Sequence, residues 1–172
     1  MDGFDVNGWM DRYIDSQTEM TDREKAQARY FRKPEDFEGV FIRLERNGQT
    51  HLRTIYVRLR AMSKVIKIPC ASEEEANVAA AFYEYLLYKS EVEKKVARAP
   101  YVERKAMRVG WIKTVSDLVK TKKESKGFMY LRDANRLDVS LEYFALMNQK
   151  IFDKDAVDSA HAKLSRYGKY YR

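Results

Sequence analysis

The 172-residue sequence has few of the residues that mark several common classes of protein. Its single cysteine, Cys70, excludes an internal disulfide and any cysteine-rich zinc site. Three prolines and seven glycines argue against many long irregular loops. No apolar run approaches the ~20 residues of a membrane span, and the acidic start Met-Asp-Gly-Phe-Asp is unlike a signal peptide. We therefore expect a soluble, intracellular protein in the cytoplasm or nucleoid of a host cell.

Residues that carry catalysis are also scarce. The only two histidines, His51 and His161, are far apart in the sequence. We expect His51 to be solvated at the end of a strand and His161 to lie at the surface or at the rim of the core. No P-loop, Cys-x-x-Cys pair or dinucleotide-binding pattern is present. Asp153 is better explained as a helix cap than as a metal ligand with Asp155 and Asp158. The sequence predicts no enzyme activity, no cofactor, no metal and no small-molecule substrate.

Positive charge is concentrated in two blocks of the chain. The formal net charge is +7 and the isoelectric point is about 9.3. Residues 38–70 contain seven Lys or Arg and two Asp or Glu, and residues 100–127 contain eight and three, so each block has a net charge of +5. Residues 1–37 and 71–99 are net negative. Such clustering is typical of a surface that binds a polyanion, although a high isoelectric point alone is common.

The hydrophobic pattern predicts an α+β fold. "EGVFIRLER" and "HLRTIYVRLR" alternate apolar and polar residues around Asn47-Gly48, which favours a β-hairpin. "KVIKIP" would form a third strand, and Ser72 with Glu75 would begin a long Ala-rich helix. We expect a three-stranded antiparallel sheet packed on that helix. The expected parts are an N-terminal helical segment (1–37), the sheet and helix (38–99) and a helical C-terminal region (100–172).

The uncovered face of this sheet would be rich in arginine. Because side chains alternate along a strand, apolar residues would face the helix, and the other face would carry Arg43, Thr54, Tyr56, Arg58, Arg60 and Lys67. A basic sheet of this kind can enter the DNA major groove. A half-exposed sheet always has a polar face, so alternation alone leaves plain solvent exposure open as the alternative.

The second block would contribute lysines. Lys120, Lys122, Lys123 and Lys126 follow a predicted helix and suit contacts to phosphates, which position DNA without reading its sequence. The alternative is a solvated helix end, where cations oppose the negative pole of the helix.

Two short patterns resemble the AP2-like DNA-binding domain, which occurs in plant regulators, phage integrases and homing endonucleases. Gly39-Val40 with Arg43 resembles the first strand of that family, and "SEEEANVA" resembles the start of its helix. The resemblance covers residues 38–88, and it departs from the family at Ile68, at Cys70 and at Ala80-Ala81. It implies a groove-reading sheet in which Arg43, Arg58 and Arg60 contact bases.

Together these patterns predict a sequence-specific binder of double-stranded DNA with no membrane partner. The simplest role is a transcriptional repressor from a phage or mobile element that occupies a promoter or operator as a homodimer. Candidates for the dimer interface, or alternatively for an ordinary core, are Leu137, Val139, Leu141, Phe144, Leu146, Ile151 and Phe152. Two other functions remain open. One is a phage-type inhibitor of a host polymerase or defence nuclease. The other is a nonspecific RNA binder that uses Tyr56, Tyr170 and Tyr171.

Overall fold

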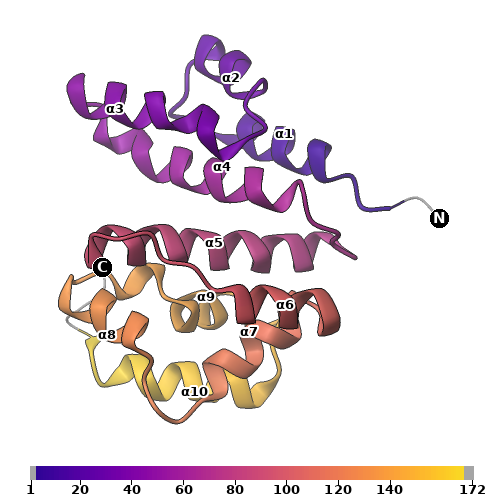
Figure 1. Cartoon of the computed structure of the whole chain (residues 1–172), viewed down its shortest axis with the longest axis vertical. Coiled ribbons are helices and arrows are strands. Elements are labelled where there is room, and N and C mark those ends of the chain that lie inside the picture. Colours follow the sequence, from indigo (N-terminus) through magenta and orange to yellow (C-terminus); the bar gives the residue numbers. More distant parts are fainter. Residues whose placement is uncertain (1–2, 169–172) are drawn as a thin grey trace. The chain divides into compact units, whose positions relative to one another are not determined.

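The computed structural model describes residues 3–168, and these residues form helices and turns without any strand (Figure 1). The prediction of an α+β fold with a three-stranded sheet is therefore wrong, and the described chain is all-helical. It divides into two compact units, residues 1–80 and 81–172. The long helix α5 (Glu73–Glu93) contributes residues to both. No helix within residues 3–168 is both long enough and apolar enough to cross a membrane.

The first unit is built from four helices besides the start of α5. They are α1 (Val6–Ser16), α2 (Asp22–Ala28), α3 (Glu38–Arg46) and α4 (Arg53–Val65), with short 3-10 turns at Pro34–Phe37 and Thr50–Leu52. Helices α3 and α4 lie side by side (Figure 1). The predicted first and second strands correspond to these two helices.

Helix α3 shows why an alternating pattern was misleading here. Val40 and Leu44 are buried, whereas Ile42 between them is 60% exposed. Residues four apart lie on the same face of a helix, but they also share the parity that defines one face of a strand. Val40 and Leu44 therefore fit both structures, whereas a buried Ile42 would fit only a strand, and its exposure agrees with the helix.

Helix α4 is buried over more than one face. Its buried residues include Ile55, Tyr56, Leu59 and Met62, at the spacing of a helix. Its β-branched residues favour a strand locally, but such preferences are weaker than tertiary packing. The 13 residues of α4 contain no Gly or Pro, so no residue breaks the helix between the predicted second and third strands.

The Asn47-Gly48 pair reverses the chain between two helices instead of two strands. Gly48 has φ 68°, which suits glycine, and its N–H donates to the carbonyl of Glu45. The next N–H, of Gln49, donates to the carbonyl of Leu44 at 2.9 Å. These two bonds form a Schellman ending of α3, a motif that places glycine where the hairpin prediction also required it.

The second unit contains α6 (Pro100–Val109), α7 (Trp111–Lys120), α8 (Lys126–Asp133), α9 (Leu141–Met147) and α10 (Lys154–Ser165), with a 3-10 turn at Leu137–Val139. Helix α10 packs on α9 and α7, and α6 packs on α7. Gly110, at φ 93°, joins α6 directly to α7. Phe82 and Trp111 meet in the core with ring centroids 5.4 Å apart.

The helix starts predicted at Ser72 and Asp153 are confirmed, and α2 begins with a similar cap. Thr21 and Glu24 form the reciprocal bonds of a capping box at the start of α2. Ser72 accepts a hydrogen bond from the backbone N–H of Glu75 at the start of α5. Asp153 caps α10 by accepting from the backbone of Ala156 at 2.9 Å.

Candidate functional site

The predicted residues of the first basic block do not share a face. Arg43, Thr54 and Lys67 are exposed, whereas Arg58 and Arg60 are half-buried on α4. Arg58 lies 3.5 Å from the side-chain oxygen of Asn77, to which it donates. The Nε of Arg60 is buried without a hydrogen-bond partner in the described chain. Residues 38–70 therefore do not form the flat, arginine-rich surface that the predicted contacts to DNA bases required.

Tyr56 belongs to the core of the first unit. It is 1% exposed, and its ring lies 6.5 Å from that of Phe37. Burial, reinforced by the carboxylate of Glu24, raises the pKa of its hydroxyl. Tyr56 thus offers no surface to a nucleic acid in this structure.

The second block forms part of a longer and more basic stretch of the chain. We call residues 94–126 the basic segment; it contains eleven Lys or Arg and three Asp or Glu, a net charge of +8. Nine of its cations are exposed: Lys94, Lys95, Arg98, Arg104, Arg108, Lys113, Lys122, Lys123 and Lys126. Only Lys113 among these nine forms an ion pair with the described residues, with Asp117. The predicted contacts Lys122, Lys123 and Lys126 are thus exposed together, whereas Lys120 is half-buried and bound to Asp153.

All three carboxylates of the basic segment are half-buried and hydrogen-bonded. Glu103 accepts from the hydroxyl of Tyr83 at 3.1 Å. Asp117 accepts from two lysines, and Glu124 accepts from the side chains of Arg166 and Tyr167. No carboxylate of the segment is exposed. The charged residues of the segment that are fully exposed are therefore all positive.

Helix α6 presents an aromatic residue among these charges. Tyr101, Arg104 and Arg108 follow one another at the spacing of a single helix face, and all three are exposed, Tyr101 by 71%. Charge counted by block did not reveal this face, because the count ignores the spacing of the residues within the block. The spacing itself was visible in the sequence.

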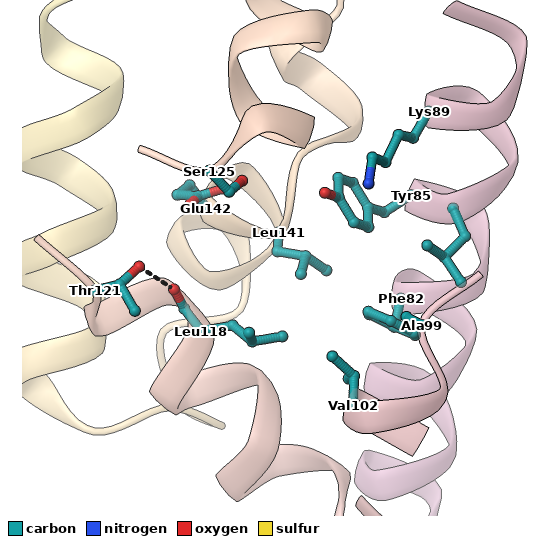
Figure 2. A pocket seen from close by; sticks show the side chains of 11 residues that line it. Phe82, Tyr85, Lys89, Ala99, Val102, Leu118, Thr121, Ser125, Leu141 and Glu142 are labelled. Carbon is teal, nitrogen blue, oxygen red and sulfur yellow. Dashed lines mark hydrogen bonds between the residues drawn. The ribbon is translucent and has the colours of Figure 1, made fainter. Parts of the chain in front are cut away.

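A pocket of about 270 Å³ lies beside the basic segment. Its apolar lining comes from Phe82, Leu86, Ala99, Val102, Leu118 and Leu141, and its polar lining from Tyr85, Lys89, Thr121, Ser125 and Glu142. Figure 2 shows Phe82, Val102 and Leu118 around one end and the hydroxyl of Tyr85 pointing toward Ser125 and Glu142 at the other. The pocket thus has an apolar end and a polar end.

Tyr85 is held close to the start of α8. A Cβ added to Gly127 would lie 1.8 Å from the Tyr85 hydroxyl oxygen, so only glycine permits this approach. Burial, with a contribution from the nearby Glu142, raises the pKa of Tyr85 to about 12. The hydroxyl is therefore protonated at neutral pH and available as a hydrogen-bond donor.

Glu142 is an acid with little access to water. It is 7% exposed, and the ammonium of Lys163 donates to it at 3.4 Å. Burial raises its pKa and outweighs the opposing effect of Lys163. The neutral carboxyl is consequently more populated than for an acid in water.

Comparison with known proteins adds no relative to this description. No family model, curated protein or solved structure matches the chain. The resemblance to the AP2-like domain implies a sheet, and residues 38–70 form helices instead. The function is therefore argued from the site alone.

The two histidines and the single cysteine are the other residues whose chemistry could serve catalysis. His51 and His161 are both exposed, as the sequence predicted. Burial and the neighbouring Glu75 raise the pKa of the half-buried Cys70 to about 11, so its thiol is a weak nucleophile at neutral pH. Within residues 3–168, no group of three or more His, Cys, Asp or Glu is placed to hold a metal ion.

The residues proposed for a dimer interface are largely covered within one chain. Leu137, Leu141 and Phe152 are buried, and the other four are half-buried. Their placement matches the alternative of an ordinary core, while the homodimer itself stays a prediction. The tail residues Tyr170 and Tyr171, named for RNA binding, lie outside the described residues.

Proposed function

We propose that the protein binds nucleic acid through phosphate contacts made by the basic segment. The observation that carries this proposal is the single sign of its exposed charge: nine exposed cations and no exposed carboxylate among 33 residues. Lys and Arg side chains that lack intramolecular partners can pair with phosphates without first breaking an ion pair. Each such pairing releases a counterion from the nucleic acid, which favours binding at low salt.

Phosphate contacts of this type do not require a particular base sequence. The proposal therefore includes double-stranded DNA, the partner that the sequence predicts, and does not depend on a base-reading sheet. It is broader than repression at an operator, because that role needed specific reading by residues 38–70. A nucleic-acid partner also agrees with the intracellular location expected from the sequence.

The test compares two matched double variants. Lys122→Ala/Lys123→Ala removes two exposed lysines of the basic segment, and Lys150→Ala/Lys154→Ala removes two exposed lysines outside it. Fluorescence anisotropy with a labelled mixed-sequence DNA duplex measures the affinity of each. Losing two phosphate contacts at about 0.1 M salt lowers affinity by about 10- to 60-fold. The control pair leaves the affinity close to that of the wild type.

Equal losses for the two variants would mean that only net charge matters and that the segment is not an interface. Wild-type protein that does not bind DNA even at low salt would refute the proposed function as a whole. Circular dichroism of both variants checks that the helical fold is retained.

A further inference from the structure

We infer that the pocket of the second unit accepts one unpaired nucleobase while the basic segment holds the phosphates on either side of it. This inference rests on the proposed function and adds a preference for single-stranded nucleic acid. Base pairing and stacking hide the bases of a duplex, so a pocket of this kind can act only on a base that has left the stack.

The size of the pocket suits a single planar ring system. Its volume of about 270 Å³ lies just below the range of ligand pockets, which is roughly 300–1,000 Å³. Phe82 contributes an aromatic side chain to the lining, and Val102 and Leu118 contribute aliphatic ones (Figure 2). A base has apolar faces that such side chains can cover, because every base presents a π-face whatever its sequence.

The polar end of the pocket suits the edge of a base. Tyr85 supplies a hydroxyl that stays protonated, and Ser125 supplies a second hydroxyl. Glu142 is nine-tenths buried, and its carboxyl oxygens, which also accept from Lys163, supply acceptors at this end. These groups match the mixture of donors and acceptors along the hydrogen-bonding edges of bases.

One cation lines the pocket, and three exposed cations are next in sequence to its lining residues, which suits the backbone of the same strand. Arg98 precedes the lining residue Ala99, and Lys122 follows the lining residue Thr121. Lys126 follows Ser125 in the same manner, and Lys89 itself lines the pocket. A nucleotide whose base enters the pocket would therefore find cations near its own phosphate and near its neighbours. An uncharged apolar ligand would make no use of this arrangement.

The test uses two labelled strands with equal numbers of phosphates. One is a 12-nucleotide oligothymidine, and the other is an abasic strand of the same length. Wild-type protein should bind oligothymidine about tenfold more tightly, as expected for burial of one base. Ala99→Leu narrows the pocket from its edge and should abolish this preference while leaving affinity for the abasic strand unchanged. That unchanged affinity also shows that the variant is folded.

Two further variants make the result decisive. Val102→Phe fills the pocket from α6 and should also abolish the preference for oligothymidine. This variant provides the test if Ala99→Leu does not fold. Tyr101→Ala removes an exposed aromatic outside the pocket lining and should retain the preference. If Tyr101→Ala abolishes the preference and the filled variants keep it, bases stack on the surface of α6 and the inference is overturned.

Two outcomes with wild-type protein separate this inference from the proposed function. Equal binding of the two strands overturns the pocket assignment but leaves phosphate binding intact. Binding of neither strand at low salt overturns both.

Discussion

Asp117 links two helices of the basic segment, and its removal should have opposite effects on stability and on binding. It lies on α7 and accepts hydrogen bonds from Lys105 of α6 at 2.7 Å and from Lys113 at 2.8 Å. These two ammonium groups lower the pKa of the carboxyl from its ordinary 3.8 to about 2. We consider the substitution Asp117→Asn, which keeps the shape and removes the charge.

The magnitude follows from the pKa. A shift of this size has a ceiling of about 2.5 kcal/mol, at about 1.4 kcal/mol for each pKa unit. The Asp117 side chain is 28% exposed, so water screens the pairs and we expect a loss of about 1 kcal/mol. Because the folded pKa lies below the unfolded pKa, the stabilisation is fully present above about pH 4 and is lost as the pH falls toward 2.

Urea unfolding of wild type and Asp117→Asn at pH 7 and pH 3 measures this effect. The difference in unfolding free energy should be about 1 kcal/mol at pH 7 and should fall by about half or more at pH 3. Asp158→Asn is the matched control, because Asp158 pairs with Lys154 on an exposed surface and should contribute less than about 0.5 kcal/mol. A difference that does not change with pH, or that equals the control, would refute the reasoning.

The same variant should bind nucleic acid more tightly. Asp117→Asn releases Lys105 and Lys113 from their shared partner and removes one negative charge from the basic segment. We expect affinity for duplex DNA to rise by up to about eightfold at 0.1 M salt, which corresponds to one additional phosphate contact. Weaker binding by the folded variant would show that the paired lysines do not lie at the interface.

Three further substitutions test the packing. Gly127→Ala should destabilise the protein by about 1–3 kcal/mol, because its Cβ would collide with the hydroxyl of Tyr85; unchanged urea unfolding would show that Tyr85 is not held there. Gly48→Ala should cost about 1–2 kcal/mol from its positive φ alone, since nothing lies within 4 Å of the added atom. A wild-type thermal midpoint would contradict that backbone conformation. Asp153→Ala should cost about 1–2 kcal/mol in urea unfolding by removing the cap of α10 and the partner of Lys120; a loss below about 0.3 kcal/mol would contradict the cap.

Local chemistry allowed parts of the fold to be predicted from the sequence. Caps such as Ser72 and Asp153 were identified correctly, because each depends on one side chain and a backbone N–H three residues away. The hydrophobic pattern predicted the wrong secondary structure at Val40 and Leu44, because their spacing fits a helix face and a strand face equally well. The hairpin predicted at Asn47-Gly48 was wrong for a related reason. A positive φ is needed both in a hairpin turn and in the Schellman ending of a helix.

Some features of the candidate site could also be predicted from the sequence, and others could not. The exposed lysines, Lys122 among them, were predictable because the residue type alone gives the charge of a side chain. The pocket was not, because Phe82, Val102, Leu118 and Leu141 come from four different helices and meet only through tertiary packing. The buried state of Tyr56 also depended on that packing.

The salt dependence of DNA binding by the wild-type protein tests the central claim most directly. If the basic segment makes about four phosphate contacts, the logarithm of the affinity should fall linearly with the logarithm of the salt concentration. Raising salt from about 50 to 200 mM should then lower affinity for a mixed-sequence duplex on the order of 100-fold. An affinity that stays flat over this range would contradict binding through phosphates.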